Sequence, residues 1–247
     1  MKAIKVLILT LLAGIPAAAQ QEGEITYEKT YRWTKIYSRL TFLSNEEKDR
    51  MKHTWGNDDE YKEKMTLLFN EKQTYYSYQK KDDNEGGYSW NRREYRIYRD
   101  FDKGTKTEIM DMVGKIHVVE DSIKAPSWKI MNKIKEVAGH MCMMAVTEDT
   151  VKSQKITAWF ANDMPMPAGP ELYTGLPGTI LELEINDGDI VVSAIEIKTR
   201  PIAAAEIDPP KKLKGKKING KQYTDIVSAH IRDSIKARRD PFWALPR

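Results

Sequence analysis

The chain has 247 residues, of which 31% are charged and 40% hydrophobic, with 40 Lys and Arg against 36 Asp and Glu. Cys142 is its single cysteine, which excludes an intramolecular disulfide and every structural zinc site that needs two or more cysteines. The near balance of charge, without a concentrated basic face, argues against a nucleic-acid partner. Stability must come from a hydrophobic core, which a chain of this length can bury.

The first 19 residues predict a secretory signal peptide. Lys2 and Lys5 precede the apolar run Val6–Ile15, and Ala17–Ala19 then offer a small-residue cleavage site. The apolar run is shorter than the roughly 20 residues that a membrane-spanning helix needs, and no second long apolar stretch follows. We therefore expect export to the periplasm or beyond, cleavage near Ala19–Gln20, and no transmembrane span after cleavage.

Beyond this segment, apolar and polar residues mostly alternate with a period of two, which is typical of β-strands with one buried face. The first such run places Ile25, Tyr27, Tyr31 and Trp33 on one face. Short turns rich in Gly, Asn and Asp separate the later runs, as expected for antiparallel hairpins. The further predicted strands are 65–69, 74–78, 95–101, 107–111, 137–147, 156–160, 179–186 and 190–199. We predict a mainly β fold of roughly ten strands, arranged as a large curled antiparallel sheet or half-open barrel.

Two helices complete the predicted fold. Ser44-Asn45-Glu46-Glu47 has the capping-box pattern and predicts a helix that ends at Gly56. Apolar residues recur at helical spacing over 223–237, which predicts a C-terminal helix. The lysine-rich run 211–217 is interpreted as an exposed connector before that helix. The predicted organisation is a signal peptide (1–19), a β-rich domain (20–208), and a basic connector with the C-terminal helix (209–247).

No catalytic motif is found: the sequence has no nucleophile elbow, no glycine-rich phosphate or dinucleotide loop, and no zinc-protease helix motif. Glu182 and Glu184 alternate with leucines, which is typical of the solvated outer face of a half-buried strand. Paired carboxylates can also catalyse glycoside hydrolysis, so a hydrolase with unrecognised carboxylates is a third alternative. We expect a protein that is not an enzyme.

A soft-metal site is one open possibility. His140, Cys142 and Met144 fall on one face of a predicted strand, and Met164 and Met166 lie on a later segment that could approach them. Imidazole and sulfur ligands suit Cu(I). The alternative is that these residues fill the core, since methionine packs irregular gaps and free cysteine behaves as a small hydrophobe. Copper is a minor hypothesis, and no other cofactor is expected.

Aromatic residues crowd the middle strands. A curled sheet with aromatic rings on its concave face can hold an apolar chain or a carbohydrate. Plain packing is the alternative, because strands favour aromatic residues whatever their role. The candidate ligand-binding residues are Tyr76, Tyr78, Trp90, Tyr95 and Trp159.

Residues 157–170 and 175–183 resemble the GLPGLI family of exported proteins. The stretch Gly175-Leu176-Pro177-Gly178-Thr179-Ile180 departs from the family signature only at Thr179. The resemblance implies a secreted or periplasmic protein of unknown function in a Gram-negative envelope, encoded near outer-membrane receptors, with no assigned catalytic residue. The strand pattern is also similar to that of LolA-like periplasmic carriers, whose half-open barrel holds lipid chains.

The glycines and prolines of this stretch are interpreted as backbone requirements. Pro177 fixes its own φ, and a glycine after proline suits the positive-φ position of a type II turn. Such a turn would reverse the chain into strand 179–186. The residues assigned to this structural motif are Gly169, Pro170, Gly175, Pro177 and Gly178.

The leading functional hypothesis is a non-enzymatic envelope protein that binds an apolar ligand or a partner segment on a concave aromatic face. The alternative is an accessory protein that docks an outer-membrane receptor or transporter. Docking would use a sheet edge or the lysine-rich segment 211–221.

Overall fold

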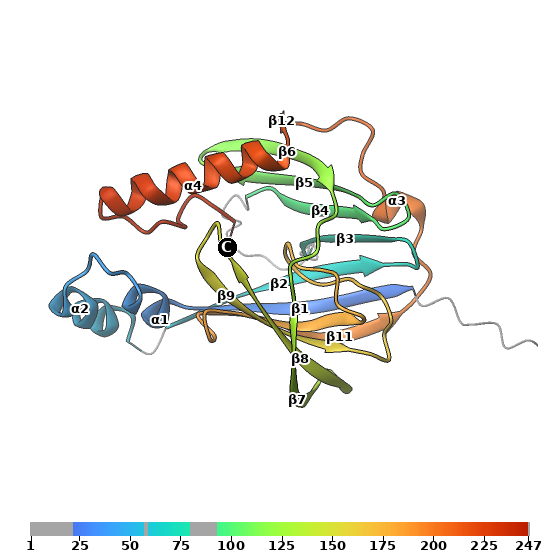
Figure 1. Cartoon of the computed structure of the whole chain (residues 1–247), viewed down its shortest axis with the longest axis horizontal. Helices are drawn as coiled ribbons and strands as arrows, with labels where there is room; N and C mark the ends of the chain where they lie inside the picture. Colours follow the sequence, from blue (N-terminus) through green and yellow to red (C-terminus); the bar gives the residue numbers. More distant parts are fainter. Residues whose placement is uncertain (1–21, 57–58, 80–92, 247) are drawn as a thin grey trace, which may run out of the picture.

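The computed structural model describes residues 22–56, 59–79 and 93–246, so the predicted signal peptide and Trp90 lie outside the described residues. The described chain forms one twelve-stranded sheet and four helices (Figure 1). None of these helices is long and apolar enough to cross a membrane. The strands are β1 (Gly23–Arg32), β2 (Glu60–Phe69), β3 (Gln73–Tyr78), β4 (Tyr95–Asp100), β5 (Thr105–Met112), β6 (Lys115–Ser122), β7 (Lys129–Val137), β8 (His140–Asp149), β9 (Gln154–Ala161), β10 (Thr179–Ile185), β11 (Ile190–Thr199) and β12 (Lys216–Ile218).

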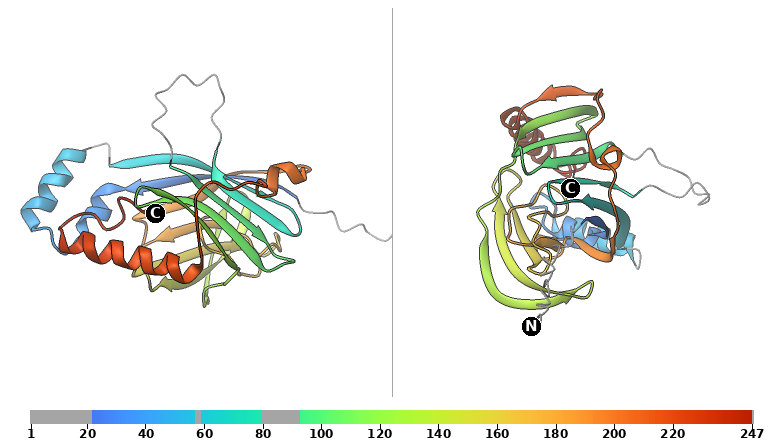
Figure 2. Two further views of the ribbon diagram at one scale, coloured as in Figure 1. Left: turned by 90° about the horizontal axis from the view of Figure 1, so that it is seen from above. Right: turned by 90° about the vertical axis from the view of Figure 1, so that its right-hand side faces the viewer.

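The sheet order is β12-β6-β5-β4-β3-β2-β1-β11-β10-β9-β8-β7. Every neighbouring pair is antiparallel except β12 with β6, which is parallel. The sheet is open, because β12 and β7 are its two edges. It curls around an interior, as the end-on view in Figure 2 shows. The mainly β, curled and unclosed architecture confirms the predicted fold class.

The helices are α1 (Trp33–Ser38), α2 (Asn45–Trp55), α3 (Ala204–Ile207) and α4 (Gly220–Lys236). The predicted capping box begins α2: the Ser44 hydroxyl accepts from Glu47 N at 3.2 Å, and Ser44 N donates to the Glu47 carboxylate at 2.7 Å. The predicted C-terminal helix is α4. The short helices α1 and α3 were not predicted, and α1 removes Trp33 from the strand on which alternation placed it.

Two other details differ from the prediction. Residues 137–147 are two strands rather than one, because Ala138 and Gly139 adopt φ values of 49° and 84° and reverse the chain between β7 and β8. The connector 211–217 also has a structural role: its lysines are exposed, but Leu213 packs against a cluster on the outer sheet face, and β12 begins within the run.

The interior of the curled sheet is filled by the inner loop, which we define as residues 162–178 between β9 and β10. Met164, Met166 and Leu176 of this loop are buried in the main core with side chains from both halves of the sheet. Ile180 N donates to Ala168 O at 2.9 Å, and the Tyr27 hydroxyl donates to Ile180 O at 2.7 Å. The middle of the concave face is therefore packed rather than hollow.

Two of the inner-loop glycines allow close approaches of the backbone. A Cβ on Gly178 would lie 2.0 Å from Ala161 O, and one on Gly175, whose φ is +91°, would lie 2.2 Å from Ala125 Cβ. The positive φ expected for Gly178 is wrong, because the left-handed residue is Gly175. Gly178 is needed instead because the carbonyl of Ala161 lies where a side chain would start.

The chain end joins the two halves of the sheet. Val227 of α4 packs in the main core, and the C-terminal tail (residues 237–246) follows the helix. Val113, in the β5–β6 turn, donates its N–H to Ala244 O at 2.8 Å, and Lys152 Nζ, in the β8–β9 turn, donates to Pro246 O at 3.1 Å. The tail thus connects the β5–β6 turn with the β8–β9 turn, which belong to opposite halves of the open sheet. It runs near α1 (Figure 1).

Candidate functional site

A charged cluster anchors the inner loop to the concave face. The Glu171 carboxylate accepts from Lys29 Nζ at 2.8 Å, from the Tyr76 hydroxyl at 2.9 Å and from the Tyr95 hydroxyl at 2.5 Å. Arg99 donates to the backbone carbonyl of Glu171. All five residues are buried. A buried charge is tolerated only when it is paired and hydrogen-bonded, and this cluster meets both conditions.

The electrostatics of the cluster follow from burial. Burial, followed by the nearby Glu171 carboxylate, raises the pKa values of Tyr76 and Tyr95 well above the usual tyrosine value. Burial lowers the pKa of Arg99, against the opposing influence of Glu108. The tyrosines therefore stay protonated and act as hydrogen-bond donors to Glu171 at all physiological pH values. The cluster therefore holds the inner loop against the concave face.

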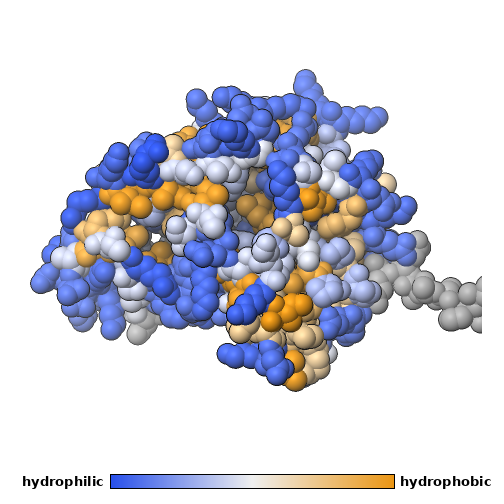
Figure 3. Space-filling view, in the orientation of Figure 1, coloured by the Kyte–Doolittle hydropathy of each residue, from blue (hydrophilic) through white to orange (hydrophobic). Residues whose placement is uncertain are grey.

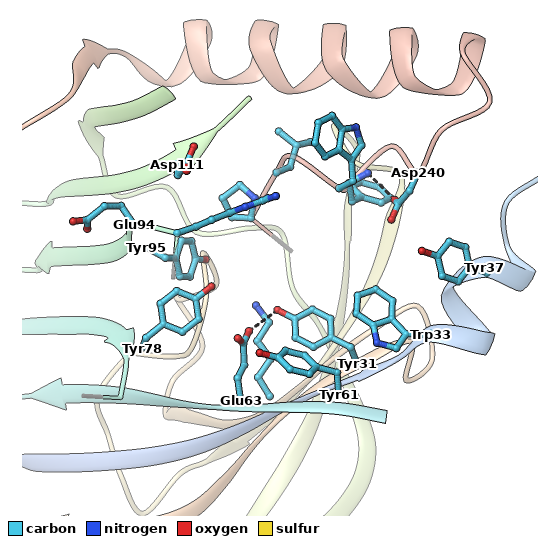
Figure 4. Close-up of a pocket in the computed structure, with 16 residues that line it drawn as sticks. Tyr31, Trp33, Tyr37, Tyr61, Glu63, Tyr78, Glu94, Tyr95, Asp111 and Asp240 are labelled. Carbon is cyan, nitrogen blue, oxygen red and sulfur yellow. Dashed lines mark hydrogen bonds between the residues drawn. The ribbon is translucent and has the colours of Figure 1, made fainter. Parts of the chain in front are cut away.

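An open aromatic cleft lies next to this packed interior, between α1 and the C-terminal tail (Figure 4). It has a volume of about 360 Å³, which lies within the range of small-ligand sites. Strands β1–β5, α1 and the C-terminal tail supply its walls. The lining residues are Lys29, Tyr31, Trp33, Tyr37, Tyr61, Glu63, Tyr78, Arg93, Glu94, Tyr95, Asp111, Asp240, Phe242, Trp243, Leu245 and Pro246.

Four rings form a continuous row along one wall of the cleft. Tyr31 and Trp33 stack with planes 10° apart and centroids 5.6 Å apart. Tyr61 adjoins Tyr31 at 5.8 Å, and Tyr37 adjoins Trp33 at 6.3 Å. Tyr61 is 52% exposed, and Trp243 of the tail is 51% exposed. Large rings half open to water on both sides of a cleft are typical of a recognition surface rather than of a core.

Polar groups surround the rings at fixed positions. The Tyr31 hydroxyl donates to Glu63 at 2.7 Å, and Asp240 accepts from Phe242 N at 2.9 Å (Figure 4). Lys29 lies on the cleft floor, with Nζ 5.3 Å from the centroid of the Tyr31 ring. The cleft therefore combines flat apolar surfaces with donors and acceptors that are held in place.

The predicted ligand-binding residues are divided between several places. Tyr78 and Tyr95 line the aromatic cleft. Tyr76 is fully buried against Glu171. Trp159, on β9, is not among the cleft's lining residues; its indole N–H donates to Glu184 at 3.0 Å, and Lys135 Nζ lies 4.3 Å from its ring centroid. Trp90 lies outside the described residues.

The soft-ligand residues have other partners. His140 Nδ1 lies 2.7 Å from Asp163 Oδ2, and Cys142 is fully buried. Burial is the main cause that raises the pKa of Cys142 to about 11, so the thiolate that Cu(I) prefers is disfavoured there. Met144 lies opposite Trp159 in the β8–β9 register. Within the described ranges, no three His, Cys, Asp or Glu side chains gather to hold a metal ion. Copper binding stays a prediction.

Several site residues were missed by the sequence reasoning, although a signal existed for some. Lys29 shares the period-two face of Tyr27 and Tyr31, and Arg99 shares that of Tyr95 and Ile97. A charged residue on an apolar face predicts an internal partner. No local signal marked Glu171, Phe242 or Trp243, since an irregular loop and a chain end have no periodicity.

Comparison with known proteins gives a partial match. Residues 146–182 match the profile of a family described as "Protein of unknown function (Porph_ging)". This match covers the inner loop and the strands beside it, and it is compatible with the GLPGLI-like resemblance. No curated protein matches the chain.

Solved structures share the fold at low sequence identity. The structure of PNGF-II in space group C2 matches with a TM-score of 0.56 and 15% identity, over 83% of this chain and 32% of that chain. The P21 form of PNGF-II matches with a TM-score of 0.54 and 14% identity, over 83% and 33%. The chain thus spans about a third of PNGF-II, and the likeness shows a shared β-sheet fold. The LolA-like resemblance is not confirmed.

Proposed function

We propose that this protein is an exported, non-enzymatic binding protein whose ligand site is the aromatic cleft. The observation that carries the proposal is the pair of half-exposed rings, Tyr61 and Trp243, on opposite walls of a cavity of about 360 Å³. The sequence predicts a ligand on the concave aromatic face, but the inner loop packs against the middle of that face. The ligand would instead be held at the open end, where the inner loop does not reach.

The composition of the cleft supports binding rather than catalysis. Among its described lining residues, none is a Ser, Thr, Cys or His. The four carboxylates of the lining, Glu63, Glu94, Asp111 and Asp240, are assigned here the role of hydrogen-bond acceptors for the ligand. The proposed export to the periplasm or beyond rests only on the signal-peptide pattern of residues 1–19. N-terminal sequencing of the protein from its native envelope is expected to begin at Gln20.

Native mass spectrometry of the protein purified from its own cells tests the proposed function. We expect a mass above that of the polypeptide, from a retained small ligand. A Tyr61→Ala, Trp243→Ala double variant should lose this added mass and keep its melting temperature within a few degrees, because both rings are half exposed. Ile195→Ala, also at a half-exposed site but outside the cleft, is the matched control and should retain the ligand. A bare polypeptide mass in all three proteins would contradict the proposal.

A second candidate function is docking to an outer-membrane receptor or transporter. Edge strand β7 projects from the body of the sheet, and its Ile134 is 68% exposed. Ile130 and Met141 are exposed beside it, and Figure 3 shows apolar surface over this end of the sheet. Exposed apolar residues on an edge strand favour addition of a strand from another protein. Crosslinking in intact cells would retain one stoichiometric partner that Ile134→Lys releases, whereas an unchanged crosslinking pattern would contradict this candidate.

A further inference from the structure

The charges in the aromatic cleft narrow the chemistry of its ligand. The lining contains two basic residues, Lys29 and Arg93, and four acidic ones, namely Glu63, Glu94, Asp111 and Asp240. Groups of both signs thus face one small cavity, together with eight aromatic rings. A ligand of this cleft must satisfy both donors and acceptors while it covers ring faces.

Two ligand classes fit this lining poorly. A fatty acid or another organic anion would enter a lining in which four acidic side chains outnumber two basic ones, and like charges repel. An organic cation would meet Arg93 in the cleft and Lys29 on its floor. Lys29 also already occupies the cation sites near the faces of Tyr31 and Tyr95, at 5.3 and 5.8 Å from the ring centroids.

A neutral ligand with many hydroxyl groups fits the same lining well. Each hydroxyl both donates and accepts, so carboxylates and basic groups can bind neighbouring hydroxyls of one molecule. Along the row, Tyr31 is buried, but Tyr61 is 52% exposed and Trp33 and Tyr37 are partly exposed, so these three rings offer apolar surface for the C–H faces of a sugar ring. Tyr61 and Trp243 of the lining are each about half exposed to solvent, so a longer chain could extend out of the cleft.

We propose that the ligand of the aromatic cleft is a neutral carbohydrate. One or more sugar rings stack on the aromatic row, and their hydroxyls bind Glu63, Asp111 and Arg93. This inference rests on the proposed binding function and names its ligand class.

Calorimetric titration of the full mature chain tests the inference. The carbohydrate probes are hexasaccharides of glucose, mannose and N-acetylglucosamine, with both α and β linkages for the hexoses. The charged probes are laurate and tetramethylammonium. We expect saturable binding of at least one hexasaccharide, weakened at least tenfold in Tyr61→Ala and in Trp33→Phe. Trp159→Phe, which changes a partly buried tryptophan outside the cleft, should bind as the unmodified protein does.

Each other outcome has a distinct meaning. Binding of laurate or tetramethylammonium that depends on Tyr61, with no hexasaccharide bound, would overturn the carbohydrate inference and leave the binding function standing. Absence of binding by every probe, together with a bare polypeptide mass in native spectra, would overturn both. Hexasaccharide binding that is unchanged in Tyr61→Ala and Trp33→Phe would place the sugar elsewhere and overturn the assignment to this cleft.

Discussion

The packed interior and the open cleft are built from the same strands and the same residue types, yet they differ in what covers them. On β3, Tyr76 is fully buried under the inner loop, while Tyr78, two residues further along the same face, lines the cleft. On β1, Lys29 pairs with Glu171 of the loop, while Tyr31 stacks with Trp33 at the cleft wall. The boundary between core and site is therefore set by how far the inner loop reaches along the sheet.

This contrast shows that aromatic content alone does not locate a site. The hydroxyls of Tyr76 and Tyr95 donate to the Glu171 carboxylate, whereas the Tyr61 and Trp243 rings at the open end are about half exposed to solvent. The distinguishing quantities are burial and internal partners, and both depend on Glu171 of the inner loop, which lies 76 to 142 residues away in sequence from its partners on β1, β3 and β4. Four experiments follow, ordered by decreasing size of the expected effect.

Replacing Gly178 with valine should abolish folding. The new Cβ would lie 2.0 Å from Ala161 O, so β9 and the inner loop could not both keep their places. We expect loss of soluble protein, or destabilisation by more than about 4 kcal/mol. Gly104→Asn is the control: nothing lies within 4 Å of a Cβ there, and asparagine tolerates its φ of +64°. A folded Gly178→Val protein that only lost ligand binding would show that the loop belongs to the site.

Glu171→Gln should cost about 3–5 kcal/mol, because it removes the buried carboxylate that pairs with the buried Lys29 ammonium. Urea denaturation monitored by tryptophan fluorescence measures the loss. The control is Glu196→Gln, which breaks the ion pair with Lys198; both side chains are more than half exposed, so the change should cost less than about 0.5 kcal/mol. Equal losses in the two variants would mean that the buried cluster does not anchor the loop.

A matched pair of tyrosine variants compares the two regions directly. Tyr76→Phe removes one of the donors to the buried Glu171 carboxylate and should cost about 1–2 kcal/mol, with ligand affinity unchanged. Tyr78→Phe removes a hydroxyl at the half-buried cleft margin and should affect affinity more than stability. Chemical denaturation and calorimetric titration of both variants give the comparison. The reverse pattern would contradict the assignment of core and site.

The last experiment concerns the thiol of Cys142, which iodoacetamide should modify only slowly in the folded protein. Burial raises its pKa to about 11, so at pH 8 nearly all of the thiol is protonated and unreactive. The rate of reaction with iodoacetamide should rise about tenfold per pH unit from pH 8 towards pH 11. The same protein in guanidinium chloride should react as an ordinary thiol does. A native rate that levels off near pH 8.5 would instead indicate an exposed, unperturbed cysteine.

The sequence predicted those parts of the fold that local patterns determine. The capping box at Ser44 and the Gly- and Asp-containing turn between the predicted strands 179–186 and 190–199 each lie where the pattern placed them, because caps and turns depend on neighbouring residues. The parallel edge strand β12 was not predicted, since three residues of a lysine-rich run carry no alternation signal and the pairing with β6 spans about 100 residues.

The candidate site was only partly predictable for the same reason. Tyr78 and Tyr95 were found because aromatic residues stand out on strands, but nothing local separated them from Tyr76. The opposite wall of the cleft comes from Phe242 and Trp243, at the far end of the chain. Tertiary contacts bring that wall into position: the tail bonds with Val113 and Lys152, Leu245 is buried in the main core, and Trp243 lies against His230 of α4.

The central place of β1 has a consequence for how the chain folds. Its two neighbours are β2 and β11, and the register pairs Gly23 with both Phe69 and Thr199. About half of the hydrogen bonds of β1, those to β11, can form only after almost 200 residues of the chain have been synthesised. Such long-range pairing gives a high contact order, for which folding takes milliseconds to seconds rather than microseconds. A newly made chain is thus expected to complete this sheet only after β11 has emerged.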